Sequence, residues 1–359
     1  MEGMLQGLKV VDLSSVLAGP LTGTFLAECG AHVLKVEPPT GDVTQTWRVA
    51  GEPSDRMSAY YAAANAGKET VFLDLKSEEG KDHLHQELQA ADVLIQNMKW
   101  NDLDIMGLMP HDLKAKYPKL IHVRLVGSEF DSQRLAYDVV VQAETGFMSM
   151  TGHPDRPPAR MPVALMDVLA SHHMRTAVFA GLFHREKTGD GWYAEVSLLG
   201  AGLTALVNQG TNALINQHVP QRQGSLHPNI APYGDLLECL DGDIVLAVGS
   251  NSQFAQLCST LGCQKLSLDS HFKNNVDRLS HRSELMRQLN AAANKWRRQD
   301  LLKALHQNRV PAGAIFNVHE ALSQEGIKER YVIQEQGLSR LRTSAIAPGG
   351  FPPDLSVES

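Results

Sequence analysis

The chain has 359 residues, a length that suggests two domains or one large domain with an insertion. Hydrophobic residues make up 43% and charged residues 20%, which is typical of a globular protein. The net charge is -7 and no cluster of Lys and Arg stands out, which argues against a nucleic-acid partner. No apolar run approaches the ~20 residues of a membrane helix, and the N-terminus lacks a signal-peptide pattern. We therefore expect a cytoplasmic protein that does not contact a membrane.

The first 200 residues alternate short apolar runs with helix-like stretches. The apolar runs predict strands at residues 9–12, 32–36, 70–73, 92–96, 120–126 and 192–196. Helices are predicted at residues 21–29, 77–90, 168–187 and 197–216. This alternation predicts an α/β fold with a mostly parallel, doubly wound sheet. Ligands of such sheets bind beyond the carboxyl ends of the strands, in the loops that follow residues 12, 36, 73, 96 and 126.

The composition changes after residue 217. Residues 218–233 are rich in Pro, Gly, Gln and Asn and indicate a linker, which we place at residues 218–225. A hairpin is expected around Asp241-Gly242, with helices at about 251–261 and 281–307, and strand-like alternation near 332–346. We predict a Rossmann-like large domain of residues 1–217 and 321–359, and a smaller α+β domain of residues 226–320.

Two segments of the first domain could bind a phosphate-bearing ligand. The small-residue loop 14–20 (SSVLAGP) follows the first strand, where backbone N–H groups can reach a phosphate. Its glycines do not make a GxGxxG fingerprint, so NAD or FAD is not supported, and a plain βα turn remains the alternative. Lys68 and Lys76 flank the third strand and could also pair with phosphates, although two solvated lysines would leave the same pattern.

Asp167 is the candidate nucleophile. It follows an apolar run and precedes a long helix, so it is either an N-cap or an ionised carboxylate that faces the cleft and is favoured by the helix dipole. An ionised carboxylate can attack an acyl group. The adjacent His172 and His173 point to different faces of one helix, and the four cysteines form no CxxC pair, so no metal site is predicted.

The order of several motifs resembles the family III CoA-transferases, which include formyl-CoA and carnitine CoA-transferases and, more distantly, α-methylacyl-CoA racemase. The longest match is LxGLKVVDLSSVLAGPLTGTFLAECGAHVLKVEPPTGD, and the matching stretches are residues 5–42, 65–80, 91–98, 137–152, 166–199, 227–258 and 310–322. The resemblance covers nearly the whole chain. It implies a Rossmann-like large domain, a small domain and an interlocked homodimer.

The resemblance also implies roles for residues. Asp167 matches the catalytic aspartate, and Tyr137 lies in the segment expected beside the thiol end of CoA. The remaining CoA contacts fall on Val16, Leu17, Ala18, Leu73, Asp74, Leu75, Lys76, Asn97, Met98 and Lys99. The implied activity moves CoA from an acyl-CoA donor to a small carboxylic acid through an aspartyl-CoA thioester, with CoA as co-substrate and without a metal or redox cofactor.

The chain departs from the family pattern at three positions. Leu17 stands where the formyl-CoA branch often has Gln, while Pro38 and Ile105 replace basic residues. Residues 224–233 replace that branch's glycine-rich loop, so a formyl-CoA or oxalate pairing is not favoured. The basic residues that could hold the CoA phosphates instead are Lys68, Lys76, Lys99 and Arg48.

Two alternatives stay open. An acyl-CoA racemase of the same fold needs two bases that flank the α-carbon, and Tyr137 stands where the racemase branch carries its His. A CoA-binding relative that keeps Asp167 but has lost turnover is the other alternative.

Overall fold

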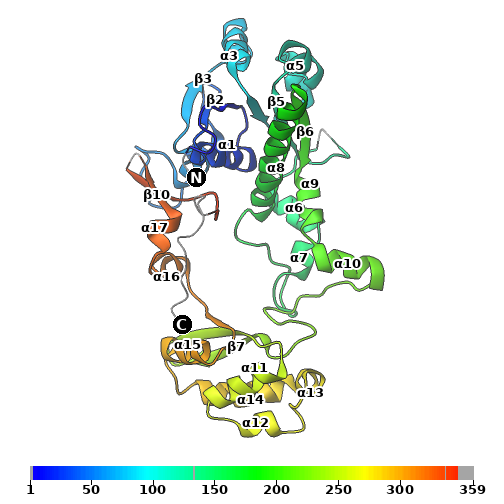
Figure 1. Cartoon of the computed structure of the whole chain (residues 1–359), viewed down its shortest axis with the longest axis vertical. Coiled ribbons are helices and arrows are strands. Elements are labelled where there is room, and N and C mark those ends of the chain that lie inside the picture. The colour runs from blue at the N-terminus through cyan, green and yellow to red at the C-terminus, as the bar shows by residue number, and fades with distance from the viewer. Residues whose placement is uncertain (1–2, 132–133, 336, 347–359) are drawn as a thin grey trace. The chain divides into compact units, whose positions relative to one another are not determined.

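The structure is a computed structural model that describes residues 3–131, 134–335 and 337–346 (Figure 1). The chain divides into two compact units. Of the described residues, the large unit contains those up to Met148, Arg160–Val219 and those from Glu329 on. The small unit contains Ser149–Ala159 and Pro220–Lys328. Residues 347–359, which we predicted to rejoin the large domain, lie outside the described residues.

The large unit is built on one parallel six-stranded sheet with the order β3-β2-β1-β4-β5-β6, which confirms the predicted α/β class. Its strands are β1 (Lys9–Asp12), β2 (His32–Glu37), β3 (Glu69–Phe72), β4 (Val93–Gln96), β5 (Ile121–Val126) and β6 (Trp192–Ser197). From β1 the chain adds strands on one side as far as β3, and then on the other side from β4 to β6. The order therefore reverses between β1 and β4, and ligands of such sheets bind at this reversal.

Helices cover both faces of the sheet. The helices of this part of the chain are α1 (Ala18–Glu28), η1 (Val43–Thr46), α2 (Ala59–Asn65), α3 (Glu78–Ala90), α4 (Trp100–Ile105), α5 (Pro110–Lys116), α6 (Asp138–Glu144), α7 (Phe147–Met150), α8 (Leu165–Thr188), α9 (Leu198–Thr204) and α10 (Val207–Asn216). Ser77 accepts a hydrogen bond from the Gly80 N–H and caps α3, which confirms the predicted start of that helix.

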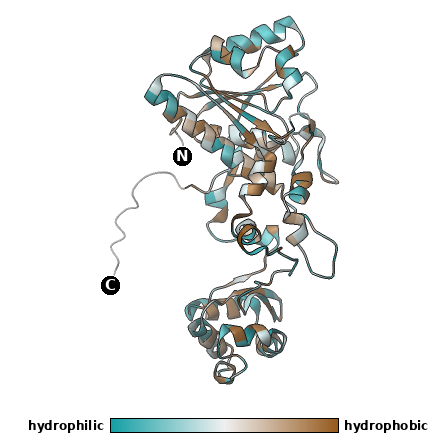
Figure 2. Cartoon of the chain, turned by 90° about the vertical axis from the view of Figure 1, so that its right-hand side faces the viewer, coloured by the Kyte–Doolittle hydropathy of each residue, from teal (hydrophilic) through white to brown (hydrophobic). Residues whose placement is uncertain are grey.

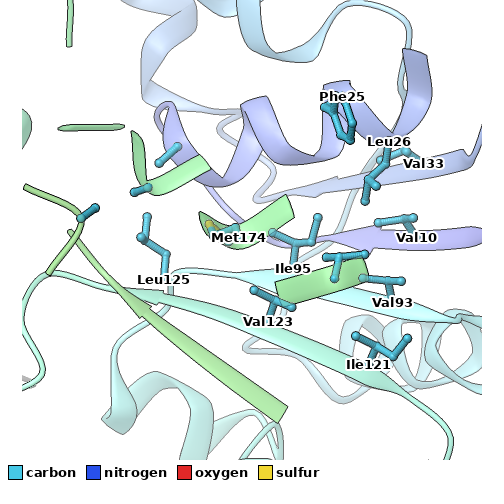
Figure 3. Packing of buried hydrophobic residues seen from close by; sticks show 14 of the residues in the cluster. Val10, Phe25, Leu26, Val33, Val93, Ile95, Ile121, Val123, Leu125 and Met174 are labelled. Carbon is cyan, nitrogen blue, oxygen red and sulfur yellow. The ribbon is translucent and has the colours of Figure 1, made fainter. Parts of the chain in front are cut away.

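The main core lies between the sheet and the pair α1 and α8 (Figure 3). Val10, Ile95 and Val123 point from three neighbouring strands toward Phe25 on α1 and Met174 on α8. All five side chains are buried. The opposite face is covered by leucines of α3, α4 and α5. The inner strands β4 and β5 are buried at every residue because both faces of the sheet are covered there, whereas the edge strands β3 and β6 are largely exposed or half-buried. Figure 2 shows hydrophobic segments in the strands of this sheet.

Two helices that we predicted as continuous are each broken in two. The predicted helix 197–216 is interrupted where Val207 has a φ of 41°, a left-handed conformation that no Gly or Pro announces. The predicted helix 281–307 is α14 (Arg282–Ala293) followed by α15 (Arg298–Gln307). Arg297 between them is extended, so the helical hydrogen bonding stops there.

The small unit has an antiparallel sheet of β7 (Tyr233–Cys239), β8 (Gly242–Ala247) and β9 (Ala312–Ala314), with the predicted hairpin between the first two strands. The remaining helices of this unit are α11 (Asn251–Thr260), α12 (Lys265–Leu268), α13 (Asn275–Ser280) and α16 (Val318–Leu322). Its own core contains Leu237, Ile244, Phe254, Leu285 and Leu301.

The last described residues return to the large unit. After α17 (Ile327–Tyr331), strands β10 (Val332–Glu335) and β11 (Leu338–Leu341) form a hairpin. Arg340 forms an ion pair with Glu28 of α1, and both side chains are buried. The Thr343 N–H donates to the same carboxylate over 3.1 Å. None of the helices in the described part of the chain is long and apolar enough to span a bilayer.

Candidate active site

A cavity of about 240 Å³ lies at the carboxyl ends of the strands, where the strand order reverses. The loops that follow β1 and β4 form part of its wall and are bonded to each other. The Ser15 N–H donates to Asn97 Oδ1 over 3.0 Å, and Asn97 Nδ2 donates to the Ser15 carbonyl oxygen, also over 3.0 Å. This reciprocal pair fixes the two loops side by side.

Most of the predicted site residues meet in this cavity. Its wall contains Val16, Ala18, Asn97, Met98, Lys99, Tyr137 and Asp167. Leu17 lines a different cavity of about 1130 Å³, next to Leu21 and Tyr60. The segment Leu73, Asp74, Leu75 and Lys76 follows the edge strand β3 and lines neither cavity. Its role in CoA binding stays a prediction.

Asp167 lies in the first turn of α8 and is not its N-cap, because the helix begins after Ala164. The N-cap interpretation of this residue is therefore wrong. Burial, together with the neighbouring Asp138 carboxylate, raises the pKa of Asp167 to about 7, although the Ala18 N–H donates to it and opposes the rise. The expectation that the helix dipole keeps this group ionised is outweighed by burial and by a like charge.

Asp138 is the charged neighbour that sequence reasoning missed. Its Oδ1 accepts from the Met166 N–H over 2.8 Å and its Oδ2 accepts from Gln142 Nε2 over 2.6 Å. It thus holds the start of the helix that carries Asp167. An Asp at the start of a helix is too common to indicate a functional role. The position of Asp138 directly after Tyr137 was the one signal for it in the sequence.

A buried ion pair anchors the loop after β1. Lys68 Nζ lies 2.8 Å from Asp12 Oδ2, and neither side chain is exposed. The ammonium also donates to the Pro20 carbonyl oxygen over 2.8 Å and to Asn65 Oδ1 over 3.0 Å. Burial lowers the pKa of Lys68 to about 8, although Asp12 opposes this. With three protein acceptors and no exposure, Lys68 cannot reach a phosphate, so that prediction is wrong.

A second buried pair holds the middle of the same loop. Asp42 Oδ2 accepts from the Val16 N–H over 3.3 Å and lies 3.8 Å from Lys35 Nζ. Lys35 in turn donates to the Ser14 carbonyl oxygen. Val16 has a φ of 72°, which is rare for a β-branched residue. Such strain persists only where the surrounding contacts hold it.

Arg124 lines the same cavity, as does Arg134, and sequence reasoning singled out neither of these cations. The Arg124 guanidinium donates to the Met98 carbonyl oxygen over 3.0 Å and to Glu195 over 2.8 Å, and it lies 4.2 Å from the centre of the Trp100 ring. Arg124 lies within β5 and lines the cavity. All residues of β5 are buried, so the sequence of this strand resembles that of a core strand and does not indicate a binding residue. Lys99 is exposed on the same wall, whereas Arg48 is engaged by backbone carbonyl oxygens elsewhere.

In the part of the chain that the structure describes, no group of three His, Cys, Asp or Glu side chains could hold a metal ion. The cavity wall offers the Asp167 carboxylate, backbone N–H groups and the cations of Lys99, Arg124 and Arg134. These groups can activate a nucleophile, stabilise an oxyanion and bind a phosphate.

Comparisons with known proteins agree over almost the full length. The chain is 36% identical to the succinate–glutarate CoA-transferase of Agrobacterium fabrum over 91% of this chain and 83% of that protein. It is 32% identical to the human succinyl-CoA:glutarate CoA-transferase (92% and 76%) and 32% identical to the acetyl-CoA:oxalate CoA-transferase of Acetobacter aceti (94% and 87%). The crystal structure of a CAIB/BAIF family protein from Brucella suis matches with a TM-score of 0.87 and 37% identity, over 97% of this chain and 93% of that one.

The family model described as CoA-transferase family III matches residues 5–358. This match confirms the resemblance on which the expected activity depended. The protein is therefore an enzyme that transfers CoA between an acyl-CoA and a carboxylic acid. The chain belongs to CoA-transferase family III.

Proposed function

We propose that this enzyme transfers CoA between dicarboxylic acids of the size of succinate and glutarate, with Asp167 as the covalent nucleophile. The relatives named for succinate and glutarate support this substrate class. The relative named for oxalate is similar to a comparable degree, but residues 224–233 of this chain replace the glycine-rich loop of the formyl-CoA branch. We therefore favour the longer acids.

The single observation that carries the proposal is the position of Asp167. Its carboxylate lines the cavity that Asn97, Met98 and Tyr137 also line, at the point where a doubly wound sheet binds its ligand. A pKa of about 7 leaves a substantial ionised fraction at neutral pH and gives a more basic oxygen than an ordinary aspartate has.

The proposed reaction has four steps, and each keeps an activated carbonyl carbon. An Asp167 carboxylate oxygen attacks the thioester carbon of the donor, and the C–S bond breaks. CoA leaves as the thiolate, and the donor acyl group stays on Asp167 as a mixed anhydride. The thiolate then attacks the aspartyl carbon, which releases the donor acid and forms an aspartyl-CoA thioester. The acceptor carboxylate attacks this thioester and expels the thiolate, giving a second anhydride. Finally, the thiolate attacks the acceptor's carbonyl carbon and frees the Asp167 carboxylate.

In the loop after β1, the N–H groups of Ser15 and Val16 already donate to Asn97 and Asp42. The Ala18 N–H, which borders the cavity beside Asp167, is therefore the candidate oxyanion donor. One such donor contributes roughly 3 kcal/mol in other enzymes. CoA enters and leaves as a co-substrate. The four steps balance without a metal or a redox cofactor.

The test is intact mass spectrometry of the wild type and of Asp167→Asn after incubation with succinyl-CoA, glutaryl-CoA, acetyl-CoA and oxalyl-CoA. We expect a CoA adduct on the wild type that hydroxylamine removes, formed fastest with succinyl-CoA or glutaryl-CoA and absent from Asp167→Asn. The variant should still bind CoA, which equilibrium dialysis measures. An adduct that persists in Asp167→Asn would overturn the assignment of the nucleophile, and fastest reaction with oxalyl-CoA would overturn the substrate class.

We further propose the interlocked homodimer that the family resemblance implies, and a cytoplasmic location. Scattered free cysteines, two of them buried, are typical of a reducing compartment. Light scattering tests the dimer, since a molar mass of one chain would contradict it.

A further inference from the structure

We propose that Asp42 is a positioning residue for the nucleophile, since it holds the loop Ser14–Ala18 so that the Ala18 N–H donates to the Asp167 carboxylate. Asp42 does not itself line the small cavity, but it accepts a hydrogen bond from Val16, which does. It acts through Val16 and Lys35. The inference rests on the proposed function, because it takes Asp167 as the group that reacts.

The contacts of Asp42 make it a rigid anchor. Its Oδ1 accepts from the Thr44 N–H over 2.9 Å and from the Thr44 hydroxyl over 2.7 Å. Its own N–H donates to Glu37 Oε2 over 3.0 Å. Its Oδ2 is then directed to the Val16 N–H, with Lys35 Nζ 3.8 Å away. A carboxylate fixed from both sides can hold a strained neighbour in place.

The charges themselves indicate a role beyond stability. The side chains of Asp42 and Lys35 are both about 1% exposed, and a buried ion pair generally stabilises a protein no better than an apolar pair of similar size. Here the pair contacts the loop at two successive points, the Ser14 carbonyl oxygen and the Val16 N–H. The loop conformation between these points is the strained one, with Val16 in the left-handed region.

The bond from the Ala18 N–H matters because other groups oppose ionisation of Asp167. Burial and the Asp138 carboxylate both raise the pKa of Asp167, and the Ala18 N–H lowers it. Tyr60 also lies close enough to interact with Asp167, and burial raises the pKa of this phenol to about 12, so it stays neutral. If the loop relaxes and the Ala18 bond lengthens, the charged form of Asp167 loses a donor and its pKa rises further.

The experiment compares Asp42→Asn and the double variant K35M/D42N with the control Thr44→Val. The double variant leaves no uncompensated charge, so it should fold even where a single change does not. Thr44→Val removes a buried hydrogen bond to the same carboxylate but leaves its contacts with Val16 and Lys35. For each protein, the rate of CoA-adduct formation from succinyl-CoA is measured between pH 5 and 9, together with CoA affinity and melting temperature.

We expect the midpoint of the rising pH limb to move up by about one pH unit in K35M/D42N, with the rate at pH 7 about fivefold lower and CoA affinity within about twofold of the wild type. Thr44→Val should melt earlier but keep the wild-type midpoint. An unchanged midpoint in folded K35M/D42N would refute the positioning role while leaving Asp167 as the nucleophile. If the wild type forms no adduct, the proposed function fails and this inference fails with it.

Discussion

Replacing Asp138 with Asn tests the electrostatics of the site most directly. The change removes the like charge that raises the pKa of Asp167, but it leaves burial, which is the larger cause. The pKa should therefore fall from about 7 by roughly one pH unit and still remain above about 4, the ordinary value for Asp. Since the ionised form reacts, adduct formation should persist to lower pH in the variant.

The variant also has a structural cost that can be separated from this effect. In the variant, the Asn oxygen can still accept from the Met166 N–H. The Asn amide nitrogen, however, faces the Gln142 amide nitrogen, which donates to the Asp138 carboxylate in the wild type. One buried hydrogen bond is lost, with a destabilisation of about 1–3 kcal/mol. Urea unfolding measures this loss independently of the pH profile.

Glu144→Gln is the matched control, because it removes the same charge from the same helix. Glu144 is paired with Arg134 and does not contribute to the raised pKa of Asp167. Adduct formation is followed by rapid quench and mass spectrometry from pH 5 to 9. A midpoint that stays in place or rises in Asp138→Asn would refute the reasoning, and so would an equal fall in Glu144→Gln.

Three further changes have expected outcomes. Lys68→Met leaves Asp12 buried and unpaired, so the free energy of unfolding should fall by about 3–5 kcal/mol at pH 7, as measured by urea denaturation. Arg124→Met removes the guanidinium that holds the loop after β4, and we expect KM for acyl-CoA to rise about tenfold with little change in kcat. Gly19→Ala places a methyl group against the Ser14 side chain, so adduct formation should slow by at least about tenfold while CoA binding, measured by calorimetry, weakens less.

The strands could be predicted from the sequence because both faces of the sheet are covered. Valines supply the apolar signal of residues 9–12 (KVVD), and four apolar residues supply that of residues 121–126 (IHVRLV). Each strand starts and ends within a residue or so of the prediction. The break at Val207 could not be predicted, since it depends on a left-handed residue that carries no Gly or Pro signal. Tertiary contacts decide such positions.

The site was predictable where it is made by loops at strand ends, and less so where it depends on buried charge. The sheet topology points to the loops after β1 and β4, and the family resemblance singles out Asn97 and Met98 in the second of these loops. The sequence does not reveal that Lys68 faces inward to Asp12 while Lys99 lies on the cavity wall. Both are lysines next to a secondary-structure element, and only the folded chain distinguishes a structural cation from one that a ligand can reach.

The ion pair between Glu28 and Arg340 has a consequence for how the protein is made on the ribosome. Its partners are separated by 312 positions, and the whole small unit is synthesised between them. The first helix of the large unit therefore emerges long before the arginine that neutralises its buried carboxylate. Until the segment that carries Arg340 has been synthesised, the large unit cannot complete its packing around Glu28.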